Sequence, residues 1–176
     1  MTTEYLLQRE VDNVLSVLTP GNALVMRVAL HTGLRVSDVL NLRSEQLASK
    51  FWITEGKTGK RKQVGLPQPL LSDLKNNAGI YWVFEGTNPK KHRTRQAVWK
   101  DVKRAAAAFR IKQNVAPHSA RKIFAVDLLN KYGDIEKVRR ALNHSSIAVT
   151  MIYAMADRQL ENNSRRRRPS PGRPAV

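Results

Sequence analysis

The 176-residue sequence contains no cysteine, few acidic residues and no long apolar run. Without cysteine the chain cannot form disulfides, thiolate metal sites or a cysteine nucleophile. No apolar stretch approaches the roughly 18 residues that a membrane-spanning helix requires. The first residues also lack the basic and then apolar pattern of a secretory signal peptide. We therefore expect a cytoplasmic protein.

The scarcity of acidic residues leaves a large positive charge. The chain has 14 Asp and Glu residues against 31 Lys and Arg residues, a formal net charge of +17. The segment from Arg158 to Val176 holds six arginines and one glutamate, so residues 1–157 still carry +12. This charge predicts a polyanionic partner. Nucleic acid is favoured over an anionic membrane surface, because no amphipathic helix with exposed tryptophan or phenylalanine stands out.

The length and composition fit one domain followed by a short tail. A hydrophobic fraction of 41% is sufficient for a packed core, which we place in residues 1–157. Residues 158–176 are polar and rich in arginine and proline, so they are predicted to be disordered without a partner.

Apolar spacing predicts a mainly helical α+β fold with a small antiparallel sheet. Gly33 is expected to form a tight turn, and Asn22 to cap the second helix. The segment 80–84 is expected to be extended at a sheet edge, and residues 56–60 to form the turn of a basic hairpin. The predicted strands cover 51–54 and 63–66, and the predicted helices cover 11–18, 23–31, 37–42, 69–76, 98–108, a segment starting at 117, 135–142 and a last one around Tyr153.

Three short motifs carry the residues suited to chemistry. They are Thr32-Gly33-Leu34-Arg35, His118-Ser119-Ala120-Arg121, and Leu142-Asn143-His144 with Tyr153 nine residues later. Two arginines, two histidines and one tyrosine on a basic chain indicate a phosphodiester held by cations and attacked by a phenol. Metal-dependent nucleases need clustered carboxylates, and no such cluster lies near these residues in the sequence. We therefore expect neither a metal nor a cofactor.

In this order and spacing the motifs resemble the catalytic domain of the tyrosine recombinases, the phage-integrase family. The resemblance runs from about Gln8 to Met155 and includes Gly56-Lys57-Thr58-Gly59-Lys60, which matches the hairpin bearing the family's catalytic lysine. Asn143 replaces the usual glycine, and asparagine is well able to adopt the left-handed conformation. No helical core-binding domain is expected upstream of Gln8, as in short members of the family or a separately expressed catalytic domain.

The resemblance implies a role for each motif residue. Arg35 and Arg121 would bind the non-bridging phosphate oxygens, because a planar guanidinium can bind two oxygens at once. His118 would accept the proton of Tyr153, the nucleophile that becomes joined to a 3′-phosphate. Lys57 would be the general acid that protonates the leaving 5′-oxygen, and Lys60 and Lys62 of the same hairpin compete for this role.

The remaining polar residues receive less specific roles. His144 would hydrogen-bond the phosphate or support Tyr153, and Asp38 would either orient an active-site group or cap a helix. Six basic residues are expected to contact the DNA backbone: Lys60, Lys62, Lys90, Lys91, Arg93 and Arg95.

The implied function is a site-specific DNA recombinase or integrase. Its expected partners are double-stranded DNA and further copies of the chain assembled on paired sites, and whether accessory DNA-bending proteins take part stays open. Two alternatives also stay open: relaxation of DNA like that of a type IB topoisomerase, and a DNA-binding regulator that does not cut. Binding alone, however, does not need Tyr153 or His118.

Overall fold

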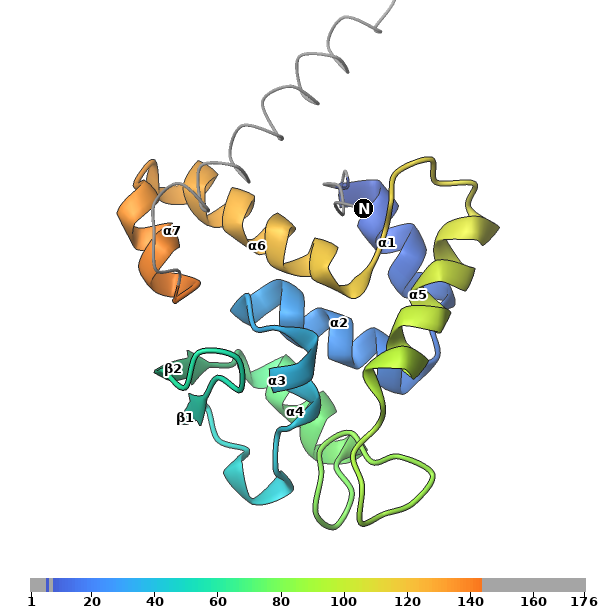
Figure 1. The fold of residues 1–176 in the computed structure, drawn as a ribbon, viewed down its shortest axis with the longest axis vertical. Coiled ribbons are helices and arrows are strands. Elements are labelled where there is room, and N and C mark those ends of the chain that lie inside the picture. Colours follow the sequence, from blue (N-terminus) through green and yellow to red (C-terminus); the bar gives the residue numbers. More distant parts are fainter. Residues whose placement is uncertain (1–5, 7, 144–176) are drawn as a thin grey trace, which may run out of the picture.

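The structure, a computed structural model, describes Leu6 and residues 8–143 and confirms a mainly helical fold with a two-stranded antiparallel sheet (Figure 1). The elements in chain order are α1 (Gln8–Val17), α2 (Pro20–Thr32), α3 (Val36–Leu40), the 3-10 helix η1 (Ser44–Gln46), β1 (Lys50–Thr54), β2 (Arg61–Gly65), α4 (Gln68–Asn77), α5 (Arg95–Ala108), α6 (Pro117–Tyr132) and α7 (Ile135–Ala141). No described helix is long and apolar enough to cross a membrane.

Helix α2 runs through the middle of the molecule (Figure 1). It packs against α1, α3, α4, α5 and α6, and α7 packs against α6. Leu24, Val25, Val28 and Ala29 are buried on its broad apolar side, whereas Arg27 and His31 are exposed. A helix with so many buried apolar residues is stable only when neighbouring elements cover them, which explains its central place.

The start of α2 differs from the prediction, because the helix begins at Pro20 and Thr19 occupies the cap position. Proline suits the first turn, where no backbone N–H is needed. Asn22, the predicted cap, is buried and donates its side-chain amide to Asp101 of α5 at 2.8 Å. Burial alone would raise the pKa of Asp101, but hydrogen bonds from Asn22, Thr19 and Arg104 lower it to about 2. This ionised carboxylate therefore ties the start of α2 to α5.

The predicted basic hairpin is confirmed. Lys50 pairs with Gly65 at one end of the two strands and Thr54 with Arg61 at the other. Phe51 and Ile53 of β1 alternate with exposed residues and face the core. The hairpin is thus anchored by one apolar face. Its other residues, including most of those of the turn, are exposed or half-buried, except for the fully buried Glu55.

The predicted extended segment at 80–84 is wrong. The structure has only an isolated bridge between Arg43 and Trp82 there, followed by a turn. Among the described residues, backbone pairing with the neighbouring segment is limited to two bonds, from Val83 N–H to Leu42 C=O at 3.0 Å and from Ser44 N–H to Tyr81 C=O at 3.2 Å. Side chains bind two further backbone groups: Ile80 N–H donates to Glu85 at 2.7 Å, and Val83 C=O accepts from Asn77 at 2.8 Å. The apolar run is therefore explained by the burial of Val83 and Phe84 in the core and not by a strand.

Helix α5 begins after a threonine cap, and helix α6 begins at a proline. Thr94 caps α5 by accepting from Ala97 N–H at 3.1 Å, so Arg95, expected in the basic loop, is the first helical residue. Helix α6 begins at Pro117, as predicted, and ends at Gly133 with a left-handed φ of 64°. The last predicted helix, around Tyr153, lies outside the described residues.

Candidate catalytic site

Arg35 is placed by the sharp turn between α2 and α3. Gly33 ends α2 with a φ of 65°, and a Cβ built there would lie 2.3 Å from the ring of Phe124 on α6. Both the conformation and the close approach require glycine. The chain then turns outward, and Arg35 becomes the N-cap residue of α3 with 19% of its side chain exposed.

Two buried carboxylates hold Arg35. Its Nη1 donates to Glu55 at 2.7 Å and lies 3.9 Å from Asp38. Burial alone would raise the pKa of Glu55, but hydrogen bonds from Arg35 and Thr58 and the charges of Arg35 and Arg121 lower it on balance. Glu55 is therefore ionised at neutral pH.

Asp38 connects α3 to the hairpin. Its Oδ1 accepts from Gly56 N–H at 3.0 Å, whereas the cap position of α3 is held by Arg35. Burial raises the pKa of Asp38 and the charge of Glu55 raises it further, against the lowering effect of the Gly56 N–H. Of the two roles predicted for Asp38, the contacts agree with orientation of the site.

The sequence-based interpretation missed Glu55, although a signal for it existed. Phe51 and Ile53 alternate as inward residues along β1, and Glu55 continues the same alternation. A residue at that register points toward the core, so a glutamate there must find a cation. Arg35 is that cation.

Arg121 joins the three predicted motifs. It is almost fully buried on α6, where it donates from Nη1 to the C=O of Gly33 and from Nη2 to the C=O of Leu142. Gly33 lies two residues before Arg35, and Leu142 lies two residues before His144. A buried guanidinium must have its donors satisfied, so these carbonyls fix the three segments relative to one another.

His118 lies one turn before Arg121 on the more open side of α6. Although part of its surface is exposed, neighbouring protein atoms bury the imidazole enough to lower its pKa. The positive charges of Arg121, Lys122, Arg35 and Lys57 lower that pKa further. His118 is therefore neutral at neutral pH and able to accept a proton.

The hairpin lysines point in different directions. Lys57 and Lys60 are exposed in and after the turn. Lys62 instead lies half-buried, with its Nζ donating to Thr32 C=O at 2.7 Å and 5.7 Å from the centre of the Phe124 ring. Burial, and then the charge of Arg121, lowers the pKa of Lys62 to about 8. Lys62 therefore lies beside the arginines and not on the outer face expected for a DNA-backbone contact.

Residues 4–159 match the Phage integrase family. The chain belongs to this family.

Named relatives include tyrosine recombinases. The chain is 31% identical to tyrosine recombinase XerA of Pyrococcus furiosus over 84% of this chain and 56% of the relative. It is 33% identical to tyrosine recombinase XerD of Lacticaseibacillus casei over 73% of this chain and 48% of the relative. The chain thus spans about half the length of these relatives.

Solved structures of the family share the fold. The catalytic domain of bacteriophage HP1 integrase matches with a TM-score of 0.68 at 22% identity, over 98% of this chain and 100% of that domain. A lambda integrase dimer bound to a COC′ core site matches with a TM-score of 0.73 at 18% identity, over 99% of this chain and 52% of that one. At these identities the likeness establishes the tyrosine recombinase catalytic-domain fold.

Other predicted residues of this family member are only partly placed by the structure. His144 and Tyr153 lie outside the described residues. Asn143, which precedes His144, has a φ of 54°, so it adopts the left-handed conformation expected where the family has glycine.

The four cations expected around the 90–95 loop divide into two kinds. Lys90, Lys91 and Arg95 are exposed. Arg93 is half-buried and donates to Asn22 at 2.7 Å, so its guanidinium is already bound within the protein. We therefore expect little DNA contact from Arg93, and the contact of Lys90, Lys91 and Arg95 with DNA stays a prediction.

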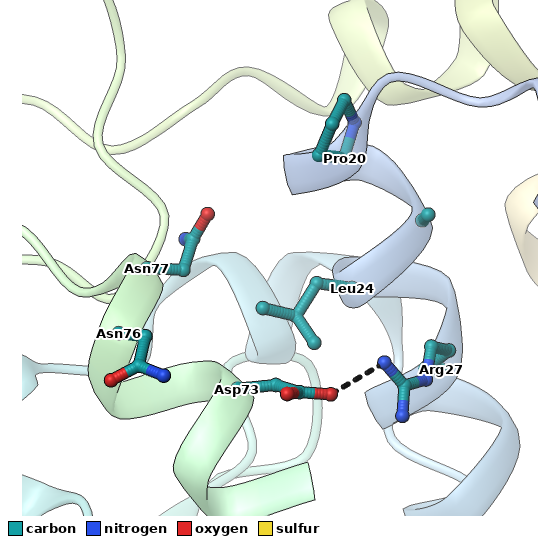
Figure 2. A pocket seen from close by; sticks show the side chains of 7 residues that line it. Pro20, Leu24, Arg27, Asp73, Asn76 and Asn77 are labelled. Atoms are coloured by element: carbon teal, nitrogen blue, oxygen red, sulfur yellow. Dashed lines mark hydrogen bonds and ion pairs between the residues drawn. The ribbon is translucent and has the colours of Figure 1, made fainter.

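A pocket between α2 and α4 lies apart from these residues (Figure 2). Pro20 and Leu24 line one side and Asn76 and Asn77 the other, and an ion pair of 2.7 Å between Arg27 and Asp73 joins the two helices. None of the predicted site residues lines it. The described residues also contain no group of three or more His, Cys, Asp or Glu side chains able to hold a metal ion.

Proposed function

We propose that this chain is the catalytic domain of a site-specific DNA recombinase or integrase that cleaves and rejoins strands through a 3′-phosphotyrosine. The observation that carries the proposal is the position of Arg121, whose guanidinium binds the segments next to Arg35 and next to His144. These contacts support the proposal that three motifs separated along the sequence contribute to one basic site. Membership of the Phage integrase family supports the same chemistry.

The proposed reaction begins with attack by Tyr153 on the scissile phosphate. The neutral imidazole of His118 accepts the phenolic proton as the new bond to phosphorus forms. Arg35 binds the non-bridging oxygens as negative charge develops on them, and Arg121 adds its positive charge from the buried side of the site, where its Nη1 and Nη2 are held by Gly33 and Leu142. His144 is proposed to donate a hydrogen bond to the same phosphate or to support Tyr153.

Departure of the 5′-oxygen completes the first step. The bond between phosphorus and the 5′-oxygen breaks, and Lys57, exposed on the hairpin turn, gives that oxygen a proton. The products are a free 5′-hydroxyl and a phosphodiester between Tyr153 and the 3′-end. A 5′-hydroxyl from another strand can reverse the step, because the covalent intermediate conserves the bond energy.

The rest of the basic surface is proposed to hold the duplex. Lys60, Lys90, Lys91 and Arg95 are exposed and free to approach phosphates. Two solved structures of similar fold, XerH bound to its difH substrate and the lambda integrase dimer bound to a core site, are protein–DNA complexes. We therefore favour double-stranded DNA with assembled copies of the chain over an isolated topoisomerase.

Covalent trapping tests the proposal. Nicked DNA carrying a recombination site lets a short 5′-fragment diffuse away after cleavage, so the wild-type chain should accumulate as a covalent complex on denaturing gels. Tyr153→Phe should abolish the complex and keep DNA affinity, because it removes the nucleophilic oxygen and little else. Tyr132→Phe, on the exposed end of α6, is the matched control and should react like the wild type.

Three outcomes would count against the proposal. A covalent complex formed by Tyr153→Phe would remove Tyr153 from the chemistry, and loss of cleavage on adding a chelator would indicate a metal-dependent centre. Relaxation of any supercoiled DNA by single copies, without a paired site, would favour the topoisomerase alternative.

A further inference from the structure

Glu55 lies between the proposed catalytic arginine and the turn that carries the proposed catalytic lysine. Its Oε2 accepts hydrogen bonds from Arg35 Nη1 at 2.7 Å and from the Thr58 hydroxyl at 2.9 Å. Its backbone also closes the turn, since its N–H donates to Lys60 C=O at 3.0 Å and its C=O accepts from Gly59 N–H at 2.8 Å. One residue thus contacts both Arg35 and the segment that presents Lys57.

The burial of Glu55 argues against a purely stabilising role. The side chain is fully buried, and its Oε1 has no hydrogen-bond partner among the described residues. A buried ion pair with an unsatisfied oxygen stabilises a fold less than apolar packing of similar volume would. The two preceding inward positions of this strand are the apolar Phe51 and Ile53. A charge at the third position therefore calls for a functional explanation.

The contact leaves one edge of Arg35 available. Within the described part of the chain, the polar contacts of its guanidinium run through Nη1, so Nε and Nη2 have no protein partner there. The side chain is 19% exposed, which leaves that edge accessible. Because the guanidinium is planar and rigid, fixing one nitrogen sets the direction in which the others point.

We propose that Glu55 is a positioning residue of the active site, fixing the Arg35 guanidinium and the Lys57 turn relative to each other so that both cations reach one phosphodiester. The inference rests on the proposed strand-cleavage function. Its physical basis is that catalysis depends on placement, and a displacement of about 1 Å can slow a reaction by about 100-fold. The ionised state of Glu55 supports this role, because a charged acceptor holds a guanidinium more firmly than a neutral one.

The test compares Glu55→Ala and Glu55→Gln in the full chain. At saturating nicked DNA, Glu55→Ala should form the covalent complex about 100-fold more slowly, yet reach the wild-type final yield. Its Kd for DNA should be unchanged or lower, since a negative charge has been removed from the site. Glu55→Gln should slow the reaction by only about tenfold, because the amide oxygen still accepts from Arg35 and Thr58 without charge assistance.

Asp101→Asn is the matched control. Asp101 is also a buried carboxylate that accepts from an arginine, but it binds Arg104 and the start of α2 and not Arg35. This variant should unfold at a lower temperature and keep the wild-type rate at saturating DNA. It separates a loss of folded molecules, which lowers the yield, from a loss of placement, which lowers the rate.

Each other outcome is decisive. A wild-type rate in both Glu55 variants would overturn the inference and leave the proposed function intact. A parallel fall in yield and stability, with an unchanged rate, would make Glu55 a structural residue only. Failure of the wild-type chain to form any covalent complex would overturn the proposed function, and this inference with it.

Discussion

Lys62 shows how burial changes what a single residue can do. In the sequence it is one of three lysines of a basic hairpin, but in the structure its ammonium group is held against Thr32 and Phe124 beside the arginines. A phosphate bound at this site would add negative charge and favour the protonated lysine. The protonation state of Lys62 therefore depends on what is bound at the site, and Lys62 contributes to the charge of the site together with the arginines.

The lowered pKa of Lys62 predicts a dependence of stability on pH. The pKa falls from 10.5 to about 8 on folding, so between these values the unfolded chain binds more protons than the folded one. Stability should therefore rise as the pH increases from about 8 to 10.5, by roughly 3 kcal/mol in total from this group. Below pH 8 the cost of burying the charged group is fully present.

Urea unfolding of the wild type and of Lys62→Met at several pH values measures this effect. The free energy of unfolding of the wild type should increase relative to that of Lys62→Met across the window, because other titrating groups are common to both proteins. A constant difference between the two would show that Lys62 keeps an ordinary pKa in the folded protein.

At the scale of one element, the β1–β2 hairpin combines a rigid base with an exposed turn. Phe51, Ile53 and Val64 anchor it in the core, whereas Lys57 and Lys60 stand on the exposed turn and its exit. Asp38 and Glu55 join the turn to α3 through Gly56 N–H and Arg35. These contacts therefore fix the hairpin next to Lys57, the proposed proton donor.

Lys57→Ala should lose cleavage of ordinary DNA and recover it with a better leaving group. A 5′-bridging phosphorothioate leaves as a thiolate and needs no proton, so it should restore the rate of Lys57→Ala by about 100-fold or more. Arg35→Ala should gain no such recovery, because its defect concerns charge on the non-bridging oxygens. Single-turnover rates on oxygen- and sulfur-bridged DNA make the comparison.

Lys60→Ala is the control for this experiment, as an exposed lysine of the same hairpin. It should show a small defect that is equal on both substrates. Recovery by sulfur at Lys60 and none at Lys57 would transfer the general acid to Lys60, and recovery at neither would remove both from proton donation.

For the whole molecule, the net charge of +17 should dominate affinity for DNA. Neutralising Lys90, Lys91 and Arg95 together should reduce the slope of log K against log salt by about 0.9 for each phosphate that the protein no longer neutralises, or about 2 to 3 in total. Fluorescence anisotropy at increasing salt concentrations measures the slope for the wild type and the triple variant.

Arg93→Ala serves as the comparison within the same loop. Because Arg93 donates to Asn22, its removal should lower thermal stability and leave the salt slope nearly unchanged. An unchanged slope in the triple variant would place the DNA on another face of the protein.

Most helix positions, the hairpin and the motifs can be predicted from the amino-acid sequence alone, because they depend on neighbouring residues. Apolar spacing located α1, α4 and α7 to within one or a few residues, and proline marked the start of α6. Asn143 was recognised as a substitute for glycine because the left-handed conformation is a local property of the residue.

Which polar groups come into contact depends on the three-dimensional fold. Asn22 was expected to cap a helix and instead binds Asp101, 79 positions away in the sequence. Glu55 received no role from the sequence and is the buried partner of Arg35, while Lys62 turned inward to Thr32. Whether a charged side chain is solvated or buried depends on which distant segment covers it, and the cost of burying a charge forces it to find a partner there. No local pattern contains that information.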